Sequence, residues 1–121
     1  MVEKISWNYV AQALSGPSLS GQGELEIDAY DKFSFIIPDN ATQQVDLVPG
    51  STVSLLVINP DKTSDKLTYK VGNKDVKLDG PHVLIGTGAV SLLGVTDKLT
   101  FANKTGADAT IEILIGRDAT P

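Results

Sequence analysis

The chain has 121 residues, a formal net charge of −5 at pH 7, 41% hydrophobic residues and no cysteine. This length fits a single β domain over residues 1–121, and the lack of cysteine excludes disulfides, thiolate zinc sites and cysteine nucleophiles. The negative charge disfavours nucleic-acid binding.

Neither a membrane span nor a secretion signal is apparent. The longest apolar run, residues 83–95, is interrupted by glycines and is shorter than the roughly 20 residues of a membrane helix. The first residues lack a basic start and an apolar stretch with a cleavage site. We expect cytoplasmic synthesis, with the final location left open.

Residues 1–16 allow two interpretations. As a short N-terminal helix, Ser6 is the N-cap, residues 7–14 are the body and residues 15–17 are the stop. As a strand, apolar side chains alternate with polar ones from Ile5 onward. We favour the strand, because the alternation begins early and the rest of the chain has β character.

From Gly23 onward the apolar residues recur with a period of two, and short apolar runs end at Gly, Pro, Asn or Asp. The expected strands after residues 24–28 are residues 33–37, 45–48, 53–58, 67–71, 76–78, 83–85, 89–93, 99–102 and 110–115. Eight to ten short strands with turns about every 8–12 residues predict an all-β fold, either an antiparallel β-sandwich or a jelly-roll-like barrel.

The alternation also predicts which side chains form the core. The expected core residues are Leu25, Ile27, Phe33, Phe35, Leu55, Val57, Leu67, Tyr69, Val83, Ile85, Leu92, Leu99, Phe101, Ile111, Ile113 and Ile115.

Two stretches resemble each other. VSLL at residues 53–56 and DKLT at residues 65–68 recur as VSLL at residues 90–93 and DKLT at residues 97–100. This similarity suggests a repeated pair of strands with a longer loop in the first copy. Strands draw on few residue types, so the same similarity also arises without duplication.

Candidate catalytic and ligand-binding residues are sparse. Residues 86–90 contain only GxG and precede an expected strand, which disfavours a phosphate site and suggests a tight turn instead. His82 is the only histidine, and we expect a surface or capping role for it. The Asp-rich and Asn-rich turns lack calcium-loop spacing and resemble ordinary turns, so we expect no metal and no cofactor.

Carboxylates and aromatic residues leave two weaker hypotheses. Glu24 and Glu26 lie about 7 Å apart on one strand face and, with Glu112, suggest a sparse carboxylate site for an enzyme. Trp7 and Tyr9 on a strand suggest a carbohydrate platform, although a buried Trp is commoner in a small sandwich.

The positive signal is the presence of strands that are apolar on both faces. Residues 53–58 and 111–115 place apolar side chains on both sides of a strand, so one side needs a cover. Our candidate interface residues are Leu56, Ile58 and Leu114. We therefore expect a non-catalytic structural or interaction protein that forms a homo-oligomer, for example a virion accessory or surface-decoration subunit. The alternatives are a carbohydrate- or small-ligand-binding module and the carboxylate enzyme.

Overall fold

The computed structural model describes residues 3–46, 51–93 and 98–119. Strands make up 67% of the described residues and helix 7%, which confirms the all-β prediction. The strands are β1 (Glu3–Gln12), β2 (Ser18–Ile27), β3 (Ala29–Ile37), β4 (Thr42–Asp46), β5 (Ser51–Pro60), β6 (Leu67–Val71), β7 (Lys74–Lys77), β8 (His82–Ile85), β9 (Lys98–Asn103) and β10 (Ala109–Ala119). A helical turn, α1 (Thr87–Val90), continues into a 3-10 turn, η1 (Ser91–Leu93).

Strands β3 to β10 form two antiparallel sheets of four strands. One sheet has the order β3-β10-β5-β8 and the other β4-β9-β6-β7. Strands β3 and β10, β4 and β9, β5 and β8, and β6 and β7 are paired, so the second half of this region runs back along the first. This nested pairing of eight strands in two sheets is a jelly roll, which confirms the predicted fold class.

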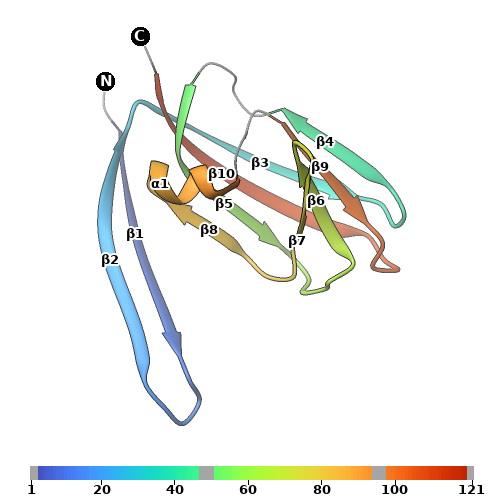
Figure 1. Cartoon of the computed structure of the whole chain (residues 1–121), viewed down its shortest axis with the longest axis horizontal. Helices are drawn as coiled ribbons and strands as arrows, with labels where there is room; N and C mark the ends of the chain where they lie inside the picture. The colour runs from blue at the N-terminus through green and yellow to red at the C-terminus, as the bar shows by residue number, and fades with distance from the viewer. Residues whose placement is uncertain (1–2, 47–50, 94–97, 120–121) are drawn as a thin grey trace.

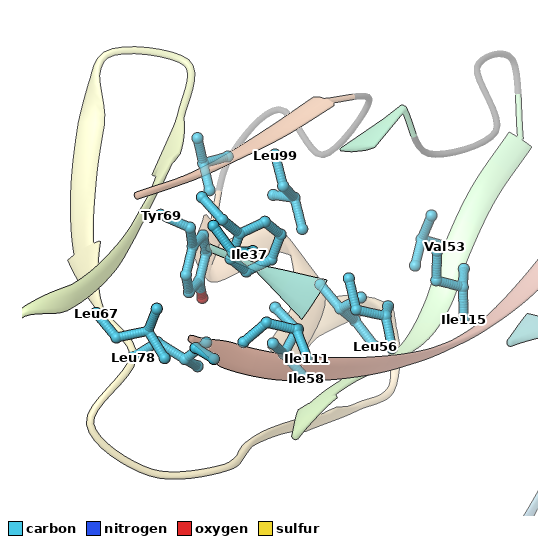
Figure 2. Packing of buried hydrophobic residues seen from close by; sticks show 14 of the residues in the cluster. Ile37, Val53, Leu56, Ile58, Leu67, Tyr69, Leu78, Leu99, Ile111 and Ile115 are labelled. Carbon is cyan, nitrogen blue, oxygen red and sulfur yellow. The ribbon is translucent and has the colours of Figure 1, made fainter. Parts of the chain in front are cut away.

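The core lies between the two sheets, because alternate side chains of each strand point inward (Figure 2). Ile111 and Ile113 from β10 meet Leu56 and Ile58 from β5, and all four are at most 1% exposed. The rings of Phe35, Tyr69 and Phe101 pack together beside them, with centroids 5.4–5.6 Å apart.

Most of the predicted core residues are buried or half-buried. The fully enclosed ones are Ile27, Leu55, Leu67, Tyr69, Leu99, Phe101, Ile111, Ile113 and Ile115. The prediction is wrong for Val83, which is 53% exposed, and for Leu92, which is 72% exposed. In β8 the register turns Leu84 toward the core and Val83 away from it, and Leu92 lies in the 3-10 turn.

The predicted strand over residues 89–93 is wrong. Gly86 has a φ of 95°, which confirms the turn expected at this glycine, and α1 begins directly after it. Val90 from this helical turn is 4% exposed and joins the core, so the second VSLL copy is helical whereas the first lies in β5.

The last two residues of each DKLT copy lie in a strand, in β6 for the first copy and in β9 for the second. Leu67 and Leu99 are both fully buried, and Tyr69 lies opposite Phe101 in the adjacent strands β6 and β9. These strands are neighbours in one sheet rather than parts of two similar hairpins, so the repeat is not a structural duplication. Residues 47–50 and 94–97, which include parts of the expected strands and repeat, lie outside the described residues.

The N-terminal segment is strand, so the predicted strand is confirmed and the helix alternative is wrong. Strands β1 and β2 form a separate two-stranded antiparallel sheet, which we call the arm. Figure 1 shows that the arm leaves the sandwich near the C-terminal end of β10 and extends away from it.

A buried asparagine fixes the turn before β10. The Asn103 amide Nδ2 donates to the carbonyl oxygens of Ile37, at 2.9 Å, and Ala107, at 2.8 Å. Its Oδ1 accepts from the backbone N–H and the hydroxyl of Thr105, at 3.0 and 2.7 Å. The side chain is 0% exposed, yet its two donors and its oxygen all have partners.

We predict that Asn103→Ala lowers the free energy of unfolding by about 3 kcal/mol or more, because it leaves several buried polar groups without partners. Asn73→Ala, in an exposed turn, is the matched control and should change stability by less than about 0.5 kcal/mol. Urea denaturation of both variants measures the difference. Equal midpoints would contradict a structural role for Asn103.

Candidate functional site: the arm and the outer sheet face

The arm has one apolar and one polar face. Directly paired residues share a face, and those of the apolar face, which we call the apolar stripe, are Ile5, Trp7, Tyr9, Ala11, Leu19, Leu25 and Ile27. Tyr9 is 46% exposed and Leu19 68% exposed. Since a two-stranded ribbon alone is marginally stable in water, the stripe needs a cover for much of its length.

Two glycines of β2 create space for the aromatic rings of β1. Trp7 lies opposite Gly23, where a Cβ atom would be 2.6 Å from Trp7 Cζ2. Tyr9 lies opposite Gly21, where a Cβ atom would be 2.7 Å from the Tyr9 ring. Each ring therefore rests on the bare backbone of the neighbouring strand, a known way to pair glycine in a sheet.

The rings of Trp7 and Tyr9 are stacked nearly parallel to each other. Their planes differ by 8° and their centroids are 6.0 Å apart. That spacing is close to the roughly 6.6 Å between alternate residues of a strand, as expected for neighbouring side chains on one face of β1.

We predict that Gly23→Ala displaces the Trp7 ring, because the new methyl group would overlap it. Trp7 is the only tryptophan, so its fluorescence reports the change directly. The emission maximum should shift to the red, and quenching by iodide should increase. Gly80→Ala is the control, since a Cβ atom at Gly80 meets no atom within 4 Å. Identical spectra for both variants would contradict the packing.

The base of the arm is fixed to the sandwich. Ile27 packs on Gly116, where a Cβ atom would lie 3.2 Å from Ile27 Cδ1 and 3.1 Å from Leu55 Cβ. Next to it the backbone N–H of Asp28 donates to the carbonyl oxygen of Arg117 at 3.0 Å. Only Asp28 separates β2 from β3, so these contacts determine the direction in which the arm leaves.

Beyond this base, the outer face of the β3-β10-β5-β8 sheet carries a row of neighbouring side chains, three of which are apolar. Lys32, Leu114, Val57 and Val83 lie side by side on the four strands, and we call this row the outer ladder. Val83 is 53% exposed, whereas Leu114 and Val57 are half-buried.

A shallow depression of about 260 Å³ lies over the outer ladder. Leu114 and Val57 contribute its apolar part, and Lys32, Asn59 and Glu112 its polar part. The Lys32 ammonium is 3.7 Å from a Glu112 carboxylate oxygen, so the charges at the edge are paired. An apolar centre with a polar rim is typical of protein interfaces.

The structure separates the three candidate interface residues. Leu56 and Ile58 are 0% exposed and belong to the core between the sheets, so they do not form a free surface. Leu114 faces outward on β10, beside Val57. Val57 and Val83 were predicted to lie in the core, but both face outward, Val57 half-buried and Val83 exposed.

The carboxylates proposed for an enzyme lie on different sheets. Glu24 and Glu26 are on the polar face of the arm, where Glu24 is 3.9 Å from Lys4. Glu112 is on the outer face of the sandwich, beside Lys32. Across residues 3–46, 51–93 and 98–119, no three Asp, Glu, His or Cys side chains lie close enough together to hold a metal.

The acidic turns make backbone contacts. The carboxylate of Asp39 accepts from the N–H of Gly106, that of Asp61 from Thr110, and that of Asp108 from Asp39 itself, at 3.0–3.2 Å. Such bonds stabilise loops without any bound ion.

His82 bridges the two sheets. Its Nδ1 is 2.8 Å from the hydroxyl of Tyr69, a hydrogen bond between β8 of one sheet and β6 of the other. The rings meet edge to face with centroids 5.6 Å apart. Tyr69 is 1% exposed, and burial raises its pKa from 10.0 to about 12.

We predict that Tyr69→Phe changes the alkaline stability of the protein. Because the folded state holds the Tyr69 proton more tightly, the wild-type free energy of unfolding is unaffected by this group below pH 10. Between pH 10 and about 12, ionisation of Tyr69 in the unfolded state should lower the wild-type free energy of unfolding by about 1.4 kcal/mol per pH unit. Tyr69→Phe should not show this pH-dependent decrease. At pH 7 its free energy of unfolding should be about 1 kcal/mol lower than that of wild type, because the hydrogen bond to His82 is removed.

Denaturant titrations from pH 7 to 12 measure both effects. Tyr30→Phe, at a residue that is 55% exposed, is the control. Parallel profiles for wild type and Tyr69→Phe would show that Tyr69 ionises as readily in the folded chain as in the unfolded one.

Comparison with protein-family models, with curated proteins and with solved structures finds no match to this chain. In the described part of the chain, no helix has the length and apolar character needed to cross a membrane.

Proposed function

We propose that this chain is a non-catalytic structural or interaction protein that associates with itself, as a virion accessory or surface-decoration subunit does. The observation that carries the proposal is the pair of apolar surfaces left uncovered within one chain, the apolar stripe of the arm and the outer ladder of the sandwich. Apolar patches of this kind on a protein surface mark interaction sites.

The position of Leu114 supports the same conclusion. It lies at the middle of the sheet, with apolar Val57 on one side and a paired Lys32 on the other. The chain carries a net charge of −5, so two copies repel each other at long range. At the outer ladder two copies can come into contact without bringing an unpaired carboxylate to the centre of the interface.

A second candidate function is carbohydrate binding by the arm. The nearly parallel, stacked rings of Trp7 and Tyr9 have centroids 6.0 Å apart and offer an aromatic surface for the apolar face of a sugar ring. The neighbouring strand contributes only Gly21 and Gly23 there, so no side chain rises above the rings from that side.

Leu114→Lys tests self-association. Wild type should sediment as a closed oligomer at micromolar concentration, and Leu114→Lys should be a folded monomer, because a charge would be buried at the contact. Thr100→Lys, on the outward-facing side of β9 in the other sheet, is the matched control and should remain oligomeric. Leu56→Lys should instead unfold the protein, since Leu56 is in the core.

Two results would argue against this proposal. A wild type that remains monomeric at high micromolar concentration removes the case for self-association. If that monomer also binds sugars on a glycan array, with quenching of Trp7 fluorescence, the carbohydrate function replaces it. Circular dichroism of each variant verifies that Leu114→Lys and Thr100→Lys are folded.

A further inference from the structure

We infer that the self-association proposed above occurs by exchange of arms: the apolar stripe of one copy lies on the outer ladder of a second copy, and the reverse contact completes a two-fold dimer. This inference rests on the proposed function and names the partner and the contact. Exchange of identical elements is a common route to closed dimers.

The two surfaces are already continuous within one chain. The row of residues next to the outer ladder includes Gly116 and Leu55, and this row is covered by Ile27 from the base of the arm. Leu55 is 2% exposed there, whereas Val83 in the next row is 53% exposed. The arm therefore covers the sheet at one row and leaves the following row open.

The base of the arm opposes closure onto its own sheet. Ile27 fits against Gly116 with little free space, and the Asp28 N–H is bonded to the Arg117 carbonyl oxygen. A swing of the arm toward its own outer ladder would break these contacts. Figure 1 shows the arm diverging from the sandwich beyond this point. A second copy can cover both surfaces without that cost.

The area is sufficient for a stable dimer. Each strand of the arm has 10 residues, which corresponds to a ribbon about 33 Å long and about 10 Å wide. One face of this ribbon has a footprint of about 330 Å², and a symmetric exchange buries two arm faces and two sheet faces. The total is at most about 1,300 Å², because the base of each arm already lies on its own sheet, and it is at the lower end of the range of stable interfaces, which begins near 1,200 Å².

The chemistry of the two surfaces also matches. The stripe provides the exposed side chains of Tyr9 and Leu19, and the outer ladder provides a depression of about 260 Å³ with Leu114 and Val57 in it. Aromatic side chains that fill such depressions are the usual source of binding energy in interfaces.

Chemical cross-linking tests the exchange, and the absence of native cysteine makes it specific. Leu19→Cys places a thiol on the stripe, and Val83→Cys places one on the outer ladder. Isotopically labelled Leu19→Cys is mixed with unlabelled Val83→Cys and treated with a short bismaleimide, and the linked peptides are identified by mass spectrometry. Leu19→Cys mixed with Thr100→Cys, on the other sheet, is the control.

We expect a product that links residues 19 and 83 between different chains, at least about tenfold more abundant than the control product. In the double variant Leu19→Cys/Val83→Cys, cross-linking should give dimers. A predominant link within one chain would show that the arm closes on its own sheet and would overturn the inference. Oligomers without any 19–83 link would also overturn it while leaving self-association intact, and a monomeric wild type would overturn both.

Discussion

Strand β10 is the element on which the rest of the structure depends, because it pairs with β3 on one edge and with β5 on the other. Its inward side chains, Ile111 and Ile113, lie in the core, and its outward side chain Leu114 lies in the outer ladder. Gly116 of the same strand receives Ile27 from the arm. One strand thus joins the core, the base of the arm and the candidate interface.

The fold class and most of the core were predictable because the period of two is strong in this chain. The alternation from Ile5 onward correctly indicated a strand, and the isoleucines of β10 were correctly assigned to the core. Alternation gives the two faces of a strand, but it does not say which face is inside when both are apolar. For this reason Leu56 and Ile58 were assigned to an interface although they are buried.

A bulge in β5 adds to this difficulty. Leu55 lies opposite Gly116 and Val53 opposite Arg117, so Ser54 is the extra residue in the pairing with β10. Leu56 on one side of the bulge and Val53 on the other both join the core, although their positions differ by three, an odd number that would put them on opposite faces of a regular strand. A strict period of two cannot predict this change of face. It also cannot predict the helical turn at Thr87–Val90, because the sequence there is as apolar as that of a strand.

The candidate site was only partly predictable, since it depends on how separate strands meet. Leu114 was identified from the sequence, but its neighbour Val57 is defined by the register between β5 and β10. For the arm, the pattern was visible in the sequence but its position was not. Its alternation is visible in the sequence, yet an amphipathic strand ordinarily packs on the nearest sheet. Here only the single residue Asp28 lies between β2 and β3, and the arm extends away from the sandwich with its apolar stripe partly exposed (Figure 1).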